Sequence, residues 1–318
     1  MPESRPESSW RFRPFLMQCA LRAFVYGVNF FMYNRPMNNK EHNILLKIRY
    51  DGTDYRGWQR QPDHPTVQGS IEEVLSYLAG EPVEISGTSR TDSGVHALGQ
   101  CASFRWNKQI PVDKIPMIIN RRFGSAGQGR PNRNGGIEIV DAREMPEDFH
   151  ARFSCIGKTY RYLIDSSGSL FRRNQAFLYN EKLDLDRMRA AAELIQGTHD
   201  FKCFETAGGT PRETTVRTVS KLSINEVNWG NSMPDPEQVR DSCGRTLAIE
   251  ITGDGFLYNM VRIITGTLVE IGAGKRQPEE MTEIIESRNR SKAGFTAPPQ
   301  GLYLKEIYFD HKFDQYLK

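Results

Sequence analysis

Short segments in which every second residue is apolar recur along this chain. Residues 44–50 show the pattern first, with Ile44, Leu46, Ile48 and Tyr50 at alternate positions. The same alternation returns at residues 102–106 and 160–164. Because successive side chains of a strand point to opposite faces, a period of two predicts half-buried strands of a sheet.

Segments with helical spacing lie between these predicted strands. Apolar residues follow a helical period in the stretches 66–80 and 184–197, which begin with the capping residues Thr66 and Asp184. A longer amphipathic helix is expected to end at Gly272. Strands mixed with helices and long loops predict an α+β protein. Its 318 residues, 38% of them hydrophobic, can form one large or two modest domains.

One polar stretch interrupts this pattern, namely Thr88-Ser89-Arg90-Thr91-Asp92-Ser93-Gly94-Val95-His96-Ala97. Alternating segments flank it, so we expect a loop at the end of a sheet, where reactive side chains are commonly displayed. Arg90 and Asp92 share a face in extended chain, and a turn at Ser93-Gly94 can hold the carboxylate at a fixed angle. On spacing alone, an Arg–Asp pair across a turn is the favoured interpretation.

The stretch closely resembles the Gly-Arg-Thr-Asp-Ala-Gly-Val-His-Ala signature of the bacterial tRNA pseudouridine synthase A family. Ser89 stands in place of the usual Gly and Ser93 in place of the usual Ala, beside an intact Arg-Thr-Asp core. The resemblance recurs in order from about Asn43 to Asp310. It favours a catalytic role for Asp92 over a merely structural pair.

The resemblance also implies a domain organisation. We expect two related α+β domains whose mainly antiparallel sheets join, with a catalytic cleft between them. The first would span residues 41–145 and carry the catalytic Asp, and the second would span residues 146–318 and complete the active site. The resemblance to the family does not extend to residues 1–40. We expect them to form a disordered extension, or to result from a mis-assigned start, with Met37 as the true first residue. Their apolar run is too interrupted by polar residues to span a membrane.

Three residues would carry the reaction implied by the resemblance. Asp92 would act either as a nucleophile or as the base that removes the ribose 2′ proton, and the sequence does not choose between them. Arg262 matches the basic partner of that aspartate, and its charge would keep Asp92 ionised. Tyr160 matches the active-site tyrosine, whose ring could stack on an extruded uracil. From periodicity alone, Tyr160 would be a core residue and Arg262 a surface residue.

A second group of residues is expected to contact the substrate. Arg90 would fill the space of the extruded base or hold the backbone, and Leu302 would pack against the target base. The glycine-punctuated stretch 51–61 contains aromatic, Arg and Gln residues that suit stacking and phosphate contact, although buried aromatics under a surface turn are the commoner explanation. The remaining expected contacts are Tyr55, Trp58, Gln59, Arg60, Arg152 and Arg161.

A glycine-rich stretch over residues 121–136 carries four Arg and no acidic residue. It is longer than the connection that the family usually has at this point. A flexible basic loop could follow an RNA backbone, and a solvated insertion is an equally simple interpretation.

Composition limits the remaining expectations. Lys and Arg number 42 and Asp and Glu 39, so the net charge of only +3 requires any RNA affinity to come from local clustering. The five cysteines are scattered and lack the paired spacing of metal ligands, which predicts reduced thiols in a cytosolic protein with no zinc. We therefore expect a cytoplasmic, soluble protein that does not enter membranes.

By resemblance, the activity is the isomerisation of uridine to pseudouridine at positions 38, 39 and 40 in the anticodon stem-loop of tRNA. The expected partners are tRNA and a second copy of the chain in a homodimer, with no metal and no cofactor. Two alternatives are a pseudouridine synthase acting at another tRNA or ribosomal RNA site, and a non-catalytic RNA-binding protein. The presence of Arg90, Asp92, Tyr160 and Arg262 together speaks against the second alternative.

Overall fold

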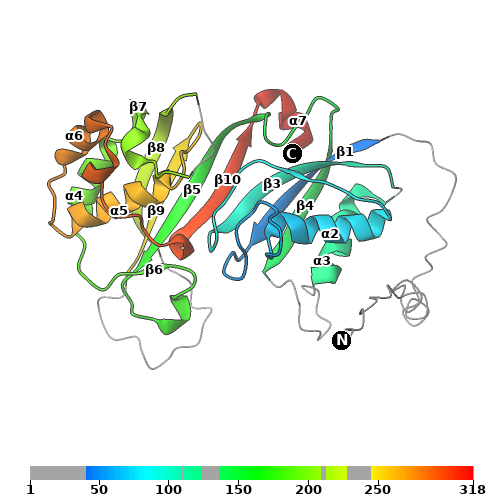
Figure 1. Cartoon of the computed structure of the whole chain (residues 1–318), viewed down its shortest axis with the longest axis horizontal. Coiled ribbons are helices and arrows are strands. Elements are labelled where there is room, and N and C mark those ends of the chain that lie inside the picture. The colour runs from blue at the N-terminus through cyan, green and yellow to red at the C-terminus, as the bar shows by residue number, and fades with distance from the viewer. Residues whose placement is uncertain (1–40, 109, 124–135, 209–212, 228–244, 318) are drawn as a thin grey trace, which may run out of the picture. The chain divides into compact units, whose positions relative to one another are not determined.

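The computed structural model describes residues 41–108, 110–123, 136–208, 213–227 and 245–317 (Figure 1). Residues 41–318 form one compact unit. The expected extension over residues 1–40, most of the basic insertion and the polar segment 228–244 lie outside the described residues. Arg121 and Arg122, which we assigned to the insertion, instead form the last turn of a helix, α3 (Ile115–Phe123).

The described chain is an α+β structure built on a ten-stranded sheet with the order β4-β1-β3-β10-β5-β9-β8-β7, in which β2 pairs with β3 and β6 with β5. The strands are β1 (His42–Tyr50), β2 (Ser86–Gly87), β3 (His96–Trp106), β4 (Ile137–Met145), β5 (Cys155–Asp165), β6 (Phe177–Leu178), β7 (Gly197–Asp200), β8 (Val216–Val227), β9 (Thr246–Gly253) and β10 (Leu302–Phe309). All pairs are antiparallel except β10 with β3 and β5 with β6. The predicted α+β class and mainly antiparallel sheet are confirmed.

Two helices, α2 (Val67–Ala79) and α4 (Leu185–Glu193), begin directly after the capping residues that the sequence predicted. The remaining helices are α5 (Met260–Gly272), α6 (Glu280–Ser287) and the short α7 (Asp314–Leu317). Thr66 accepts a hydrogen bond from the amide of Gly69, and Gly80 ends α2 in the left-handed region at φ 72°. Asp184 caps α4 by accepting from two backbone amides of its first turn.

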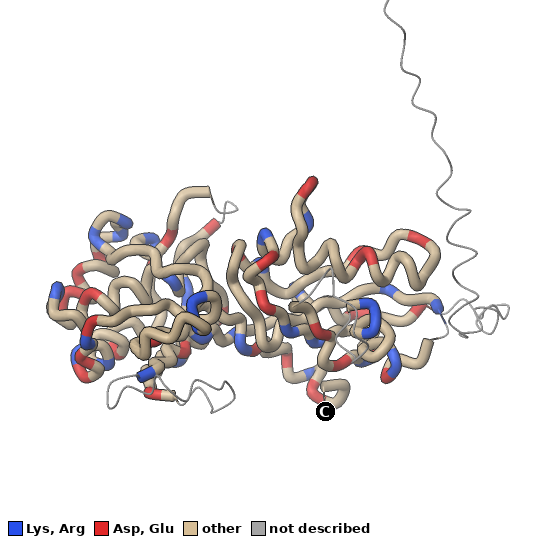
Figure 2. Tube along the Cα trace, turned by 90° about the horizontal axis from the view of Figure 1, so that it is seen from below, with Lys and Arg blue, Asp and Glu red and all other residues tan. Residues whose placement is uncertain are grey.

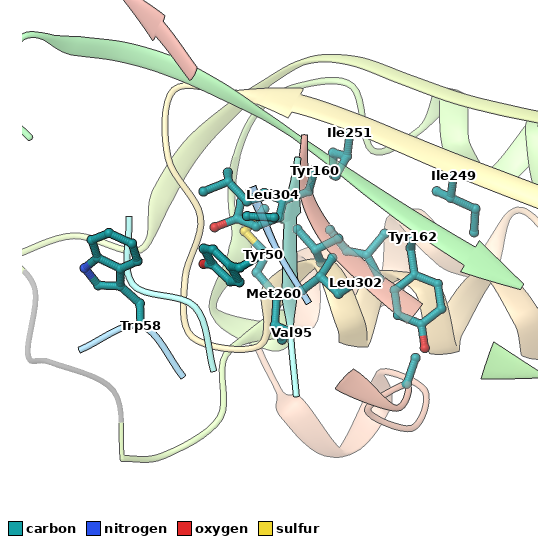
Figure 3. Packing of buried hydrophobic residues seen from close by; sticks show 14 of the residues in the cluster. Tyr50, Trp58, Val95, Tyr160, Tyr162, Ile249, Ile251, Met260, Leu302 and Leu304 are labelled. Atoms are coloured by element: carbon teal, nitrogen blue, oxygen red, sulfur yellow. The ribbon is translucent and has the colours of Figure 1, made fainter. Parts of the chain in front are cut away.

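The main hydrophobic core lies on one face of the sheet. Ile44, Leu46 and Ile48 of β1 are fully buried in it, together with side chains of α2 and α3. Tyr160 and Tyr162 of β5 belong to the same cluster, which continues into α4, α5 and α6. Figure 3 shows this packing around β5 and β10. The alternation in sequence therefore predicted correctly which side chains of these strands face the core.

The opposite face carries a smaller core. Leu45, from the same strand as Ile44 and Leu46, packs there with Phe149, Phe309 and Phe313. The ring of Phe149 meets those of Phe309 and Phe313 edge-on, with centroids 5.1 and 4.9 Å apart. Because Leu45 lies between Ile44 and Leu46 on β1, its side chain points to the opposite face of the sheet and packs in this second core.

The sequence of residues 197–204 predicts a loop, and this prediction is wrong. These residues form the edge strand β7 and a turn of 3-10 helix over Phe201–Phe204. Residues Gly197 to Asp200 pair in antiparallel register with β8. A short strand with exposed or half-buried side chains has no apolar alternation, so only its pairing reveals it. Asp200 has a structural role here, because its side chain accepts a hydrogen bond from the amide of Lys202 at the start of the 3-10 turn.

Charged residues are spread over this framework. Figure 2 shows Lys and Arg interspersed with Asp and Glu along the described elements. Within the part of the chain that the structure describes, no helix is both long and apolar enough to cross a membrane.

Candidate active site

The loop between β2 and β3 is held at both ends and in its middle. The amide and hydroxyl of Thr88 both donate to the carbonyl of Cys101, at 2.9 and 3.0 Å. In the middle, the carbonyl of Thr91 accepts from the amide of Trp58 at 3.0 Å, and its hydroxyl lies 2.7 Å from that of Tyr50. The expected turn forms, because the amide of Val95 donates to the carbonyl of Asp92 at 3.1 Å. The Asp92 backbone is thus fixed by contacts on two sides.

The glycine-punctuated segment 51–61 packs directly beside this loop. Gly57 has φ 89°, and a Cβ atom there would lie 2.6 Å from the carbonyl oxygen of Thr91. Only glycine permits both that conformation and that approach. The ring of Trp58 is buried and lies against Gly87, where a Cβ atom would overlap it. The segment therefore supports the loop, as well as lining the space in front of it.

Asp92 faces Arg262, which projects from the first turn of α5. The distance from Arg262 Nη1 to Asp92 Oδ2 is 3.7 Å, and the side chains are 15% and 34% exposed, respectively. Two further contacts fix the guanidinium, because Nε donates to the carbonyl of Ala297 and Nη1 to Oδ1 of Asn259, both at 2.7 Å. The pair is an ion pair without a direct hydrogen bond, and one side of the carboxylate remains partly open.

Burial and the neighbouring charge have opposite effects on Asp92. Burial raises the pKa of the carboxyl above its ordinary value, and the attraction of Arg262 lowers it only in part. Burial likewise lowers the pKa of Arg262, which the charge of Asp92 partly offsets. Arg262 therefore favours the ionised carboxylate as expected, although burial has the larger effect. A carboxylate with raised proton affinity is a better proton acceptor than an exposed one.

The pair lies in a cavity of about 1040 Å³. Of the predicted site residues, the cavity lining includes Trp58, Gln59, Arg90, Asp92, Arg152, Tyr160, Arg262 and Leu302. Arg56 and Lys158 also line it, so five basic side chains stand against the acidic Asp92, Glu205 and Asp254. An excess of positive charge in a concave site attracts an anionic ligand such as a nucleic acid backbone.

Two separate parts of this chain, residues 47–154 and 191–310, match the sequence model of the family described as tRNA pseudouridine synthase. The chain belongs to this family. Its relatives include "tRNA pseudouridine synthase A" of Acetivibrio thermocellus, 43% identical, and that of Caldicellulosiruptor bescii, 44% identical, each over 269 residues that cover 84% of this chain and 99% of the relative. "tRNA pseudouridine synthase A 2" of Clostridium tetani is 41% identical over 272 residues, with the same coverage of both chains.

Three residues that we expected to contact substrate lie outside the cavity of this family member. Tyr55 is buried, and Nη1 of Arg60 lies 3.3 Å from Oε2 of Glu72. Arg161 Nε donates to Glu250 at 2.7 Å. Arg161 alternates with Tyr160 and Tyr162, which face the main core, so its side chain leaves β5 on the opposite face.

Other residues of the site were missed in the sequence. Lys158 lines the cavity, and its position two residues before Tyr160 on one strand would have placed both on the same face. Asn259 holds Arg262 from one turn earlier in the chain, and its Nδ2 donates to Thr206 at 2.8 Å. Phe153 is 77% exposed although it lines the cavity. Phe153 is apolar and lies in a stretch that resembles the family, and nothing in the sequence indicates that its side chain is exposed.

Metal ligands were not expected in this family member. Among the described residues, no group of three or more His, Cys, Asp or Glu side chains is arranged to hold a metal ion. Cys101, Cys155 and Cys203 are free thiols. Cys19 and Cys243 lie outside the described residues.

Proposed function

We propose that this protein isomerises uridine to pseudouridine in the anticodon stem-loop of tRNA, at positions 38, 39 and 40. The observation that carries the proposal is the Asp92–Arg262 pair at 3.7 Å inside a basic cavity, in a chain of the tRNA pseudouridine synthase family. The names of the relatives support tRNA as the substrate, and the resemblance of the motifs supports the anticodon positions.

In the proposed reaction, the N1–C1′ glycosidic bond breaks, the base turns, and C5 bonds to C1′. The proton of C5 is released to solvent and N1 gains one, so atoms and electrons balance without an external oxidant or reductant. Asp92 acts in its ionised form, either by attacking the substrate or by accepting the ribose 2′ proton. Both routes require the carboxylate to be partly accessible, as its 34% exposed side chain is. No metal or cofactor is part of this scheme.

The cavity side chains have separate roles in this proposal. Tyr160 provides a ring and a hydroxyl beside the target uracil, and Leu302 packs against the base. Arg90 occupies the space that the flipped base leaves or holds the backbone. Arg152 and the other basic side chains of the cavity pair with phosphates. In the segment that supports the loop, the exposed Gln59 and Arg60 contact tRNA, whereas the buried Tyr55 and Trp58 hold the segment in place.

We extend the proposal to the organisation of the protein. Residues 41–145 form a first domain with Asp92, and residues 146–318 form a second with Tyr160, Arg262 and Leu302. The protein acts in the cytoplasm as a homodimer, in which one tRNA contacts both subunits. These statements rest on the resemblance to the family, whose curated relatives this chain matches over 99% of their length.

The test is the release of tritium from C5 of uridine in a labelled tRNA transcript. The wild-type protein should release tritium, and Asp92→Asn should release none while binding tRNA with similar affinity, because the amide keeps the shape of the carboxyl but cannot act as a base or nucleophile. Normal turnover by Asp92→Asn would refute the role of Asp92.

Mapping of modified positions then separates the proposal from its alternatives. In RNA from a deletion strain, pseudouridine should disappear only at positions 38, 39 and 40 of tRNA. Loss at another tRNA or ribosomal RNA position would favour a synthase of different specificity. Binding of tRNA without any tritium release would favour a non-catalytic RNA-binding protein.

A further inference from the structure

Ser89 links two cavity residues that come from a different part of the chain. Its Oγ lies 2.9 Å from the hydroxyl oxygen of Tyr160 and accepts a hydrogen bond from Nζ of Lys158 at 3.3 Å. The backbone at Ser89 is fixed as well, because Gln100 Nε2 donates to its carbonyl at 2.6 Å. Glycine, the usual residue of the family signature at this position, has no side chain with which to make these contacts.

The charge of Lys158 favours one direction for this link. The ammonium group of Lys158 can only donate, so the Ser89 oxygen accepts from it and retains its own single proton. Hydrogen bonding to a cation polarises a hydroxyl group and makes it a stronger donor. The Ser89 hydroxyl is therefore best used as a donor to the oxygen of Tyr160. The proton of Tyr160 is then directed away from Ser89.

The ring of Tyr160 is held independently of this bond. It is only 7% exposed and meets Phe256 edge-on, with ring centroids 5.2 Å apart. On β5, Tyr160 pairs with Leu304 of β10 on one side and Ile251 of β9 on the other. Packing therefore fixes the ring, and the contact with Ser89 Oγ holds its hydroxyl group. Ser89 therefore acts on the hydroxyl group of Tyr160 and not on its ring.

We propose that Ser89 is a positioning residue, which accepts a hydrogen bond from Lys158, donates one to the Tyr160 oxygen, and so holds the Tyr160 hydroxyl group in place beside the substrate base. This inference rests on the proposed function, since it assigns the orientation of a group that acts there on uracil. No bond of the substrate is made or broken by Ser89 itself.

The first expected result concerns Ser89→Ala in the tritium-release assay. Losing one charge-assisted link should lower kcat by about 3- to 30-fold. KM and tRNA affinity should change little, because the ring and the basic side chains stay in place. Ser89→Thr keeps the hydroxyl and should restore most of the loss. A raised KM with unchanged kcat would show that Ser89 contributes to binding instead, and would overturn the inference.

A double-mutant cycle with Tyr160→Phe gives the decisive result. If Ser89 acts through the Tyr160 hydroxyl, Ser89→Ala should cause no further loss of kcat once that hydroxyl is absent. Ser93→Ala is the matched control, because the Ser93 hydroxyl donates to the carbonyl of Tyr55 at 3.3 Å, and its effect should add to that of Tyr160→Phe. Additive losses for Ser89→Ala, in a wild type that is active, would overturn this inference alone. No tritium release by the wild type would overturn the proposed function, and this inference with it.

Discussion

Replacing Arg262 by Met should move the acid limit of activity to higher pH. Two unit charges at the observed 3.7 Å interact by about 1 kcal/mol in bulk water and about 4.5 kcal/mol at an effective dielectric constant of about 20. Loss of the cation removes an attraction in this range of about 1 to 4.5 kcal/mol, and it therefore raises the pKa of Asp92. Because the Asp92 side chain is 34% exposed, we expect the lower half of this range.

The sign follows from the charge state that the reaction needs. Asp92 acts ionised, so a higher pKa means that activity is lost at a higher pH as the solution is acidified. Initial rates of tritium release at tRNA concentrations below KM give kcat/KM, whose acid limb reports the pKa of the free enzyme. Arg262→Lys is the matched control, because it keeps a positive charge and should shift the limb much less than Arg262→Met.

Two results would refute this reasoning. If the acid limb of Arg262→Met coincided with that of the wild type, either Asp92 would not set the limb or Arg262 would not lower its pKa. If Arg262→Lys shifted the limb as far as Arg262→Met, the effect would come from the lost hydrogen bonds to Asn259 and Ala297 and not from charge.

Two further predictions concern tRNA binding and stability. Phe153 is 77% exposed at the cavity, with the Arg152 guanidinium 5.7 Å from its ring centroid, so Phe153→Ala should raise KM for tRNA by about 5-fold or more through lost stacking on a base. Phe153→Tyr should keep the wild-type KM, and equal KM values for all three proteins would contradict stacking. Gly266 of α5 has no space for a Cβ atom, which would overlap the carbonyl oxygen of Phe295, so Gly266→Ala should lower the free energy of unfolding by about 1–3 kcal/mol. Denaturant unfolding measures this change. An unchanged midpoint would contradict the prediction and show that the backbone at Phe295 moves to make room for the methyl group.

The elements predicted correctly are those whose signals are local. Thr66 and Asp184 mark helix starts because a side chain can cap only the amides that follow it directly. The alternation in β1 and β5 reports burial on one face of a strand. β7 was missed because its evidence is its pairing with β8, and no period in residues 197–200 reveals a partner about twenty positions away.

The site was predictable as far as the motif reached. The loop at residues 88–95 and its turn follow from the sequence, whereas the approach of Arg262 came only from resemblance. Contacts such as that between Ser89 and Tyr160 join residues 71 positions apart, and nothing in either neighbourhood indicates the other. For Arg161 the prediction was wrong although the sequence held the evidence. Its position next to Tyr160 on a strand places its side chain on the opposite face, and only its positive charge suggested a contact with RNA.

The separation of Asp92 and Arg262 depends on β10, the last strand in the sequence. β10 lies between β3, which follows the Asp92 loop directly, and β5, which carries Tyr160. Tyr303 pairs with His96 on one side and with Arg161 on the other, so a single residue of β10 fixes the end of the loop relative to β5. Leu302, the preceding residue, reaches the cavity, and the segment before β10 supplies the Ala297 carbonyl that holds Arg262. β10 therefore sets the distance between the Asp92 loop and Tyr160, and the segment before β10 orients Arg262. This arrangement explains how residues from distant parts of the chain form a site with one geometry.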